Sequence, residues 1–515
     1  MNTPLTPLEP VLRALHLHAD RTALRCGDVT LSYAELARRT AQMVTLLREA
    51  GLHPGGHVAL VSPNTLDALI AFHAVPLAGG VIVPLNTAFD DHDLNFLLRH
   101  ADPVGVFVDR AQLPRVAHTL EALRLPYRAT GPDAALAAEL DTHAPAELRL
   151  PEGLKEDQPI SVNYTSGTTS DPKGVMLTHR NMHTSLCNLL YHLNLRPGHA
   201  HLHALTLSHS NGWGMAWAVT AAGAEHVLPT RPQPLGAADL RAELAAVTHL
   251  TATPALLAPL ADMPQAAPLP RPVRVLLAGT TPTLPLITGL QAQGFEVLHG
   301  YGLTETSAVL TVTDLGAQPG ADAALLRRQG HAMLHGGEIQ VVLEDGTPVP
   351  ADGQTPGEVV IRSNQVMKGY YKNPRATRRA IKNGWLHTGD LAVLHPDHRL
   401  EILDREGDLL KLAGHPMSSV QIEAVLYRHP SVREAVVVAA PGEDGDQPVA
   451  FLTLHPGAQV TGREILGFCT PHLPAYALPR RAVITTDLPK TASGKVLKHV
   501  LRAEVKDKRL GHSAD

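Results

Sequence analysis

Residues 164–174 read Tyr-Thr-Ser-Gly-Thr-Thr-Ser-Asp-Pro-Lys-Gly and follow the strand-like run ISVNY. Small residues allow successive backbone N–H groups to point at one anion, and the neighbouring hydroxyl groups add donors. Lys173 supplies a compact positive charge near the end of the segment. The order differs from the Walker A pattern G-x-x-x-x-G-K-[ST], which this chain lacks. The segment therefore predicts a phosphate-binding loop between a strand and a helix.

Short apolar runs alternate with helix-like segments around this loop, through about the first 300 residues. Four of the runs are typical of strands buried on both faces: HVALV (57–61), VGVFV (104–108), VRVLLA (273–278) and FEVLH (295–299). The alternation predicts an α/β fold, with helices layered on mostly parallel sheets.

One helix near the start has clear end signals. Ser32 and Glu35 have the spacing of a capping box, and Gly51 stands where the C-terminal cap would lie. The residues expected on one face of this helix share helical spacing: Ala34, Ala37, Ala41 and Val44.

The pattern changes after about residue 335. Two strand-like runs there flank the turn residues Asp345-Gly346, which predicts a small antiparallel β subdomain. From Asp404 onward, a helix near 420–427, strands near 435–438 and 449–454, and a final helix indicate a separate α+β region.

A chain of 515 residues exceeds the size of one hydrophobic core. We therefore expect a large N-terminal domain at residues 1–403 that includes the antiparallel subdomain. A small α+β domain is expected at residues 404–515, which is within the usual size range of domains.

The composition, 44% apolar and 18% charged, is that of an ordinary globular protein. The formal net charge of -5 gives no overall attraction to nucleic acid or to an anionic membrane. No stretch reaches the roughly 18 apolar residues that span a bilayer, and the start lacks the pattern of a secretory signal. These features predict a cytoplasmic location.

The cysteines and histidines give weak signals. Cys26, Cys187 and Cys469 lie far apart without metal-ligand spacing, so we expect buried thiols rather than disulfides or a zinc site. His201 and His203 have the spacing to share one side of a strand and bind a metal, but neither a cysteine nor a carboxylate lies beside them. We therefore favour histidines without a metal.

The ordered run from residue 165 to 173 matches, at nearly every position, a phosphate-loop signature. It resembles that of the superfamily of AMP-forming acyl-CoA synthetases, peptide-synthetase adenylation domains and luciferases. The likeness recurs in order over about residues 30–502, although Ser170 stands where many members have glycine. It implies ATP as a substrate with Mg²⁺. The residues that it assigns to nucleotide phosphates are Thr165, Ser166, Gly167, Thr168, Thr169 and Lys173, with Thr165 also a metal ligand.

The segment HGYGLTETSA resembles the adenine and magnesium motif of the same superfamily. The resemblance implies that Tyr301 stacks on adenine and that Thr304 donates a hydrogen bond to the α-phosphate. Glu305 is the implied magnesium ligand, a role for which a carboxylate oxygen is suited.

Two later motifs extend the resemblance. GWLHTGDLA implies that Asp390 accepts hydrogen bonds from both ribose hydroxyls, and ILDREGDLLK places Arg405 beside the ribose. PKTASGK implies that Lys495 is the catalytic lysine, which binds the acid's carboxylate and the α-phosphate together.

The resemblance implies a two-step reaction: formation of an acyl-adenylate with release of pyrophosphate, then transfer of the acyl group to coenzyme A. A mobile C-terminal domain would rotate between the steps about Gly407, where relatives commonly have Lys or Asp. Gly414 would lie on the path of the coenzyme A thiol. Relatives usually read Gly-Gly-Glu-Asn at residues 413–416, where this chain has Ala-Gly-His-Pro.

LSHSNGW (207–213) resembles the segment that borders the acid and the thiol, with His209 as the gate. Gly279, Thr280 and Thr281 resemble the loop between the acyl pocket and adenine. No cation lies among these residues to pair with a second carboxylate, which favours a largely apolar monocarboxylic acid. The whole pattern is most similar to medium- and long-chain fatty acyl-CoA ligases, with aryl-acid and methylthioalkanoate ligases as near relatives.

Other activities stay open from the sequence. An enzyme that loads a separate acyl carrier protein would share the first step, and luciferase-like oxygenation shares the fold. A non-catalytic nucleotide-binding protein would have little use for Lys173, Glu305 and Lys495 together. The resemblance leaves a homodimer open as well.

Overall fold

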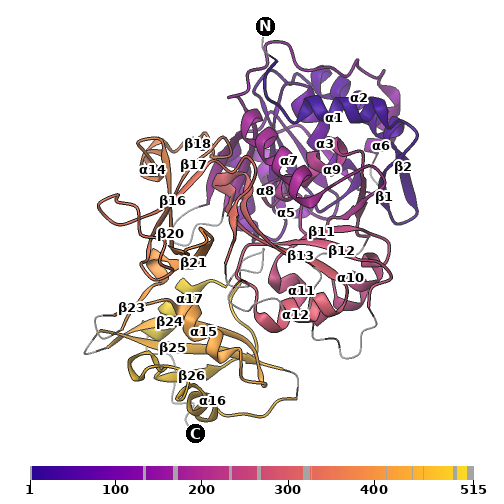
Figure 1. Cartoon of the computed structure of the whole chain (residues 1–515). Helices are drawn as coiled ribbons and strands as arrows, with labels where there is room; N and C mark the ends of the chain where they lie inside the picture. Colours follow the sequence, from indigo (N-terminus) through magenta and orange to yellow (C-terminus); the bar gives the residue numbers. More distant parts are fainter. Residues whose placement is uncertain are drawn as a thin grey trace. The chain divides into compact units, whose positions relative to one another are not determined.

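A computed structural model shows the arrangement of the chain (Figure 1). The residues that it describes are 3–131, 135–165, 172–230, 235–261, 263, 268–316, 325, 328–412, 415–442, 445–455, 457–490 and 496–506. The chain divides into two compact units, and each is described by itself. The first comprises residues 1–167, 171–339 and 361–386, and the second comprises 168–170, 340–360 and 387–515.

The first unit contains a seven-stranded sheet with the order β18-β8-β7-β4-β3-β5-β6. Strands β3, β4, β5, β6 and β7 pair in parallel, whereas β8 is antiparallel to β7 and to β18. The strand bounds are β3 His57–Val61, β4 Val81–Leu85, β5 Gly105–Asp109, β6 Tyr127–Thr130, β7 Pro159–Thr165, β8 Lys173–Thr178 and β18 Gly369–Tyr370.

A nine-stranded sheet in the same unit has the order β15-β14-β13-β12-β11-β9-β10-β1-β2. Its central strands are parallel and both of its edges are antiparallel. The bounds are β1 Thr22–Cys26, β2 Val29–Ser32, β9 Ala200–Leu202, β10 Glu225–Leu228, β11 His249–Ala252, β12 Val273–Leu277, β13 Phe295–Leu303, β14 Ala308–Gly316 and β15 His331–Ala332. The predicted α/β fold with mostly parallel sheets is confirmed.

The helices of this unit connect the strands and cover the sheets (Figure 1). Their bounds are α1 Leu8–Leu17, α2 Tyr33–Glu49, α3 Leu66–Leu77, α4 Asp91–Ala101, α5 Leu113–Ala122, α6 Leu136–Thr142, α7 His179–Leu193, α8 Ser210–Trp213, α9 Met215–Ala221, α10 Ala237–Leu244, α11 Pro254–Ala261, α12 Leu284–Ala292 and α14 Pro374–Ala380, with the 3₁₀ turn η1 at Thr304–Thr306.

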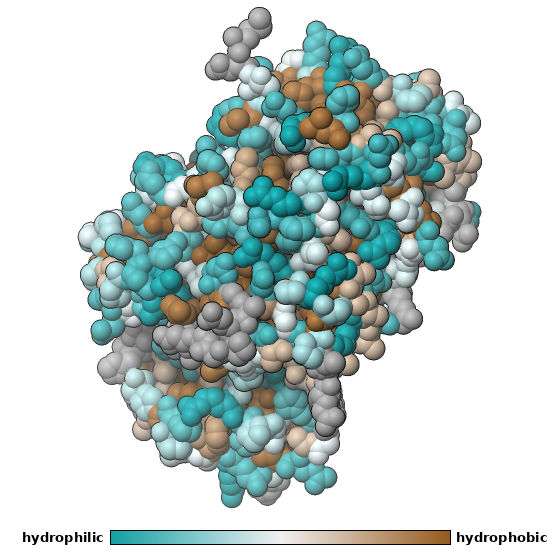
Figure 2. All heavy atoms as spheres, turned by 45° about the vertical axis from the view of Figure 1, so that its right-hand side comes forward, coloured by the Kyte–Doolittle hydropathy of each residue, from teal (hydrophilic) through white to brown (hydrophobic). Residues whose placement is uncertain are grey.

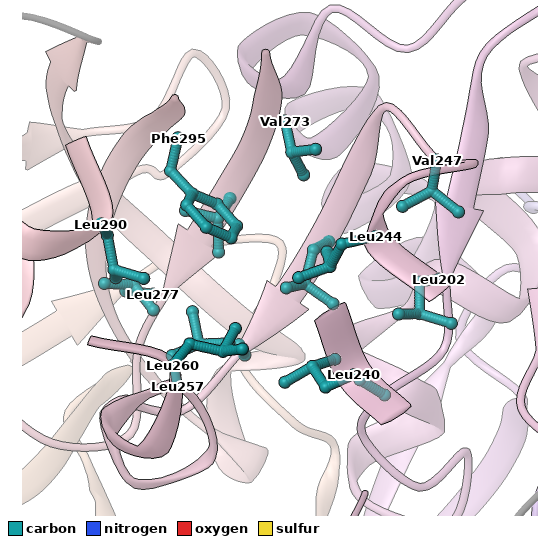
Figure 3. Packing of buried hydrophobic residues seen from close by; sticks show 14 of the residues in the cluster. Leu202, Leu240, Leu244, Val247, Leu257, Leu260, Val273, Leu277, Leu290 and Phe295 are labelled. Carbon is teal, nitrogen blue, oxygen red and sulfur yellow. The ribbon is translucent and has the colours of Figure 1, made fainter. Parts of the chain in front are cut away.

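Leucine-rich faces of α10, α11 and α12 pack on the nine-stranded sheet (Figure 3). Leu240, Leu244 and Leu257 from the helices lie among Val273 and Phe295 from the strands, and all of them are fully buried. Burial of such side chains stabilises a fold by about 1.5–3 kcal/mol each. This packing fixes the strands whose carboxyl ends lead into the candidate site.

The segment predicted as a phosphate loop is followed by a different element than expected. It is followed by the strand β8 and only then by the helix α7, so it connects two antiparallel strands. The run GVMLT continues the sheet by pairing antiparallel with β7, and its apolar side chains suit a largely buried strand. Helix α7 begins after its N-cap Thr178, which forms a capping box with Asn181.

The predicted first helix is α2, and its expected face is buried in part: Ala41 and Val44 are buried, whereas Ala37 is only half-buried. Ser32 caps it by accepting a hydrogen bond from the Glu35 N–H, and Ala34 is exposed whereas Tyr33 is fully buried. Ala50 is the C-cap. Gly51 follows it with a φ of +86°, and its N–H bonds the Arg48 carbonyl, which completes a Schellman ending with the bond from Leu52 to Leu47.

Tyr33 joins α2 to the end of α9. Its hydroxyl donates to the carbonyls of Ala224 at 2.7 Å and Thr220 at 3.1 Å, and burial raises the pKa of the phenol well above its ordinary value. The tyrosine thus supplies a donor to the Ala224 carbonyl and adds a second contact to Thr220, whose carbonyl also accepts from the Gly223 N–H. The departure from the expected face is thus confined to the start of the helix, where Tyr33 is buried in place of Ala34.

The second unit contains a three-stranded sheet, β24 Val432–Gly442, β25 Gly445–Leu454 and β26 Arg481–Ile484. Alternate residues of β24 lie in two cores: Val437 packs with α15 Ser419–Leu426 and α16 Gly462–Cys469, and Val436 packs with α17 Lys498–Lys506. The short strands β22 Leu410–Leu412 and β23 His415–Met417 pair with each other, and η2 Glu406–Asp408 and η3 Ala475–Ala477 are 3₁₀ turns. The prediction that the C-terminal region is a small domain of mixed helices and strands is confirmed.

A five-stranded sheet contributes residues to both units. It has the order β16-β17-β20-β19, with β21 paired to β20. Its bounds are β16 Glu338–Val342, β17 Gly357–Arg362, β19 Ile381–Lys382, β20 Trp385–Leu394 and β21 Leu400–Arg405. The turn predicted at Asp345-Gly346 lies between β16 and β17, and Gly346 has a φ of +84°. The small β subdomain is therefore confirmed.

The thiols are less buried than expected. Cys469 is fully buried, but Cys26 and Cys187 are only partly buried, and all three are free. On the face in Figure 2, hydrophobic residues occur in small groups among hydrophilic ones. Isolated exposed apolar side chains such as Tyr191 and Leu334 are normal for protein surfaces. None of the described helices is long and apolar enough to cross a membrane.

We expect Tyr33→Phe to lower the free energy of unfolding by about 1–3 kcal/mol, because it leaves a buried carbonyl without its donor. Chemical denaturation of both proteins measures the difference. Tyr191→Phe, at a side chain that is 65% exposed, is the matched control and should leave stability unchanged. Equal stability of Tyr33→Phe and the wild type would show that the hydrogen bonds do not hold α9.

Candidate functional site

The two arms of the predicted phosphate loop are a paired stretch of strand. Thr165 at the end of β7 lies opposite Lys173 at the start of β8, so the sheet fixes both ends of the loop. The Lys173 ammonium lies 5.5 Å from the centre of the Tyr370 ring, a cation–π arrangement. The loop residues Ser166, Gly167, Thr168 and Thr169 lie outside the described residues.

Strand β13 extends further than the sequence predicted and includes Tyr301. It is followed by the turn of Thr304 and Glu305, after which β14 returns antiparallel to it. The two strands approach so closely at Gly302 that an added Cβ would lie 1.9 Å from the Ala308 carbonyl oxygen. Glycine is therefore required there, and the turn places the three predicted nucleotide residues on one hairpin.

Buried polar groups hold this turn. The Gln365 amide donates to the carbonyls of Thr306 at 3.1 Å and Val309 at 3.3 Å, and the Ser307 hydroxyl donates to the Gln365 carbonyl. Asn188 in α7 donates to the Gln365 side-chain oxygen. Gln365 is fully buried with its polar atoms satisfied, so it supports the turn at little desolvation cost.

Tyr370 connects Glu305 with Lys173. Its hydroxyl donates to Glu305 Oε1 at 2.8 Å, and its ring lies beneath the Lys173 ammonium. The Met367 N–H donates to the Glu305 carbonyl, which fixes the backbone of the same residue. Glu305 Oε2 makes no hydrogen bond to any residue in the described ranges, so one carboxylate oxygen is left for a cation. The structure thus brings the predicted metal ligand and the predicted phosphate-binding lysine to one tyrosine.

The segment after His209 is one turn of left-handed helix. Trp213 N–H donates to the His209 carbonyl and Gly214 N–H to the Ser210 carbonyl, both at 3.2 Å. The three non-glycine residues cost about 1–2 kcal/mol each in this conformation, or about 3–6 kcal/mol in all. The five residues with positive φ are Ser210 (48°), Asn211 (58°), Gly212 (59°), Trp213 (56°) and Gly214 (80°).

Buried contacts offset this strain. Asn211 is fully buried and its amide donates to Ser161 Oγ on β7 at 2.9 Å. The preceding loop is held by Asn64, whose side chain accepts from the Leu207 N–H and donates to the carbonyls of His203 and Leu205. Strained backbone that is held by its surroundings is typical of functional sites.

The left-handed turn reaches the nucleotide hairpin. Ser210 Oγ lies 2.8 Å from Thr304 Oγ1, so a hydroxyl of the predicted acid-binding segment is hydrogen-bonded to one of the predicted α-phosphate site. The His209 ring next to it makes no hydrogen bond to a described residue, and burial lowers the pKa of the imidazole. A neutral, unpartnered ring suits the predicted gate.

Gly279 and Thr280 lie in the loop that follows β12. Gly279 has a φ of +96°, and both residues are exposed. Strands β11, β12 and β13 are parallel neighbours, so their carboxyl ends meet at one edge of the sheet. Ligands of α/β proteins commonly bind at such an edge.

In the second unit, Asp390 and Arg405 are cross-strand partners on β20 and β21. Arg405 Nε lies 3.3 Å from Asp390 Oδ1, and only 6% of the Asp390 side chain is exposed. Glu358 fixes the turn before the aspartate by accepting from the Gly389 N–H at 3.0 Å and by bonding to His387. The predicted ribose-binding pair is therefore brought together.

Lys495 and Gly414 lie outside the described residues, as do residues 491–494. The ends of the loop that contains Lys495 are described: the Leu497 N–H donates to the Pro489 carbonyl at 2.8 Å. Lys490 pairs with Glu434 at 2.6 Å. The described residues on either side of 491–495 are therefore bonded to each other and to strand β24.

His201 and His203 belong to a buried chain of side chains. His203 Nε2 lies 2.8 Å from His226 Nδ1, His226 Nε2 lies 2.7 Å from Thr220 Oγ1, and His73 Nε2 lies 2.9 Å from the same hydroxyl. His203 lies beyond the end of β9, so the two histidines do not share one strand. Among the described residues, no group of three or more His, Cys, Asp or Glu side chains could hold a metal ion.

Sequence reasoning missed three supporting residues, Tyr370, Gln365 and Glu358. A polar residue that supports a neighbouring turn leaves no periodic pattern, so it is found only from its contacts. Tyr370 gave the strongest signal, because it lies in VMKGYYKNP, a segment used for the resemblance.

The strands that flank the predicted phosphate loop, the Tyr-Gly-Leu-Thr-Glu hairpin and the Asp390–Arg405 pair carry the motifs expected of an adenylate-forming enzyme. Residues 12–371 match the family described as AMP-binding enzyme, and residues 421–495 match the AMP-binding enzyme C-terminal domain. The chain belongs to the AMP-binding enzyme family, as the sequence predicted.

Its relatives are ligases. An acetate–CoA ligase from Humulus lupulus is 35% identical, over 98% of this chain and 95% of the relative. A peroxisomal butyrate–CoA ligase from Arabidopsis thaliana is 33% identical, over 97% of this chain and 93% of the relative. Because this relative is named as peroxisomal, the cytoplasmic location stays a prediction.

Solved structures share the whole fold. ATP-bound MatB from Rhodopseudomonas palustris has a TM-score of 0.88 at 25% identity, over 98% of this chain and 100% of that one. The o-succinylbenzoate CoA synthetase from Bacillus subtilis with its acyl-adenylate has a TM-score of 0.84 at 28% identity, over 97% and 98%. The predicted fold class is confirmed over both units.

We expect Tyr370→Phe to raise the magnesium concentration needed for ATP binding by about 10-fold, since loss of a group that orients a metal ligand typically costs 10–100-fold in affinity. Titration calorimetry with ATP at a series of Mg²⁺ concentrations measures it. Tyr371→Phe, which changes the next side chain, is the matched control. An identical magnesium requirement in the two variants would contradict the role of the Tyr370 hydroxyl.

Acid should weaken the fold through its buried histidines. Burial lowers the pKa of His73 to about 4 and that of His203 to about 3, below the value of about 6.5 in the unfolded chain. Below pH 6.5 the unfolded chain therefore binds more protons than the folded chain. As the pH decreases, the free energy of unfolding decreases by up to about 1.4 kcal/mol per pH unit for each histidine.

His73→Gln should reduce this slope between pH 6.5 and 5 relative to the wild type, as measured by urea denaturation at each pH. His92→Gln, at an exposed position, is the control and should keep the wild-type slope. An unchanged slope in His73→Gln would mean that this histidine does not titrate on unfolding.

Proposed function

We propose that this chain is an ATP-dependent acid:thiol ligase that activates a monocarboxylic acid as its acyl-adenylate and transfers the acyl group to coenzyme A. The observation that supports it most strongly is the contact of both Lys173 and Glu305 with Tyr370. A cation for the phosphates and a carboxylate for a metal thereby lie beside the strands that flank the phosphate loop.

The described residues fit a nucleotide with magnesium. Glu305 Oε2 is open to a hard cation, and carboxylate oxygen is the donor that Mg²⁺ prefers. When bound by Glu305 and Thr165, the ion would neutralise phosphate charge. Tyr301 would stack on adenine, and Asp390 with Arg405 would bind the ribose hydroxyls.

In the first step, the acid's carboxylate attacks the α-phosphorus of ATP and pyrophosphate leaves. Lys173 and the phosphate loop hold the leaving group. Thr304 donates to an α-phosphate oxygen and Lys495 stabilises the added negative charge, which are interactions that strengthen as the phosphorus becomes five-coordinate. The coenzyme A thiol then attacks the acyl carbon, and AMP leaves.

We place the start of the mobile domain at Asp404 and its pivot at Gly407. Asp404 Oδ2 accepts from the Ser419 N–H at 2.9 Å, and Arg502 donates to the Gly407 carbonyl at 3.0 Å. Residues 404–407 are thus bonded to α15 and α17, which supports a boundary just before them. A Cβ on Gly407 would meet nothing within 4 Å, so this conformation alone does not require glycine.

For the acid, we propose a short- or medium-chain aliphatic monocarboxylate. Neither the turn at 209–214 nor residues 279–281 contain Lys or Arg, so a second carboxylate would have no partner there. The relatives named for acetate and butyrate favour the short end of the predicted fatty acids. Aryl acids are the second candidate, since a benzoate–CoA ligase from Arabidopsis thaliana is 33% identical.

The test is release of pyrophosphate and AMP with a panel of acetate, butyrate, octanoate, palmitate and benzoate, with coenzyme A or acyl carrier protein as the thiol. We expect turnover with coenzyme A and one of the shorter aliphatic acids. Turnover with benzoate alone would exclude the aliphatic assignment, and transfer only to the carrier protein would exclude coenzyme A.

In the same assay, Lys495→Ala should slow pyrophosphate release by about 10²–10³-fold, because a transition-state donor is lost. It should spare thioester formation from synthetic acyl-adenylate, since that step does not need this charge at the α-phosphate. Pyrophosphate release near the wild-type rate would remove Lys495 from the mechanism.

A further inference from the structure

Ser210 and Thr304 come from different parts of the fold. Ser210 is the first residue of the left-handed turn and is 5% exposed, and Thr304 opens the 3₁₀ turn after β13. Their hydroxyl oxygens lie 2.8 Å apart, within the range of a good O–H···O hydrogen bond.

A hydroxyl has one proton, so only one of the two can donate across this contact. Under the proposed function, Thr304 must donate its proton to a phosphate oxygen, which is an acceptor only. The Ser210 hydroxyl must then be the donor in the pair, and Thr304 Oγ1 the acceptor.

We propose that Ser210 is a positioning residue for adenylate formation: its hydroxyl donates to Thr304 Oγ1 and thereby directs the single Thr304 proton at the α-phosphate. The inference rests on the proposed function. Without Ser210, the Thr304 hydroxyl would rotate between the phosphate and other acceptors, and its proton would be correctly placed for only part of the time.

The backbone conformation at residue 210 favours glycine, so the presence of serine there indicates a role for its side chain. At a φ of +48° glycine is the residue with least strain, and glycine occupies two of the five positions in this turn. The turn is also anchored by the hydrogen bond from Asn211 to Ser161, which does not involve the Ser210 side chain. Within the described residues the Ser210 hydroxyl is hydrogen-bonded to Thr304 alone, so the residue that strains the backbone is also the one whose side chain reaches the nucleotide hairpin.

Ser210→Gly separates positioning from structure, because it removes the hydroxyl and relieves the backbone strain at once. We expect an equal or higher Tm, KM values for ATP and the acid within about twofold of wild type, and adenylation kcat lowered by about 10-fold, less than the 10²–10³ for loss of a direct donor. Ser210→Cys, a weak donor of similar shape, should give an intermediate kcat.

A double-mutant cycle with Thr304→Val tests whether Ser210 acts on adenylation through the Thr304 hydroxyl. If Ser210 acts through Thr304, then Ser210→Gly should cause no further loss in the Thr304→Val background. Asn194→Gly, at a left-handed position that is exposed and outside the site, is the control for glycine substitution and should keep wild-type kinetics.

Wild-type kcat in Ser210→Gly would overturn the inference, as would a full additional loss in the Thr304→Val background. A fall in Tm with parallel changes in KM and kcat would assign Ser210 a structural role instead. These outcomes presuppose that the wild-type protein releases pyrophosphate with some acid of the panel. Its failure to do so would contradict the proposed function itself, together with the inference that rests on it.

Discussion

The close approach of β13 to β14 at Gly302 is the constraint on which the candidate site depends. It forces a tight turn directly after the strand, and that turn sets Thr304 and Glu305 beyond the edge of the sheet. A turn of this kind exposes backbone carbonyls to the interior. Gln365 donates to two of them, which gives these buried groups a partner. Glu305 can then meet Tyr370, and Thr304 can meet Ser210.

Polar side chains hold the site from several directions, and the leucine core does not. The apolar packing of α10, α11 and α12 in Figure 3 fixes the strands, but it would tolerate many different loops at their ends. The loops are specified by buried amides such as Gln365 and Asn64, each with a defined set of partners. Such networks give a single arrangement because any other arrangement leaves a buried group unpaired.

Backbone strain is concentrated at the same place. The left-handed turn at 210–214 costs free energy. It persists because the hydrogen bonds of Asn211 and Asn64 determine the path of the backbone. A right-handed turn would place residue 210 on a different side of the segment. The strained left-handed backbone is therefore also the conformation in which Ser210 contacts Thr304.

The sequence by itself determined the α/β layers, the small C-terminal domain and the family, because hydrophobic period and ordered motifs are local features of the chain. It located Lys173, Tyr301, Glu305, Asp390 and Arg405, of which Asp390 with Arg405 and Lys173 with Glu305 are brought together within their units. It missed Tyr33 as the residue that the first turn of α2 buries and placed a helix where β8 begins, since both features depend on what packs against the segment. Only the tertiary structure decided that Tyr370 and Gln365 support the hairpin and that Ser210 contacts Thr304. Those contacts join residues about 60 to 95 positions apart, and no local pattern encodes a hydrogen bond between such distant side chains.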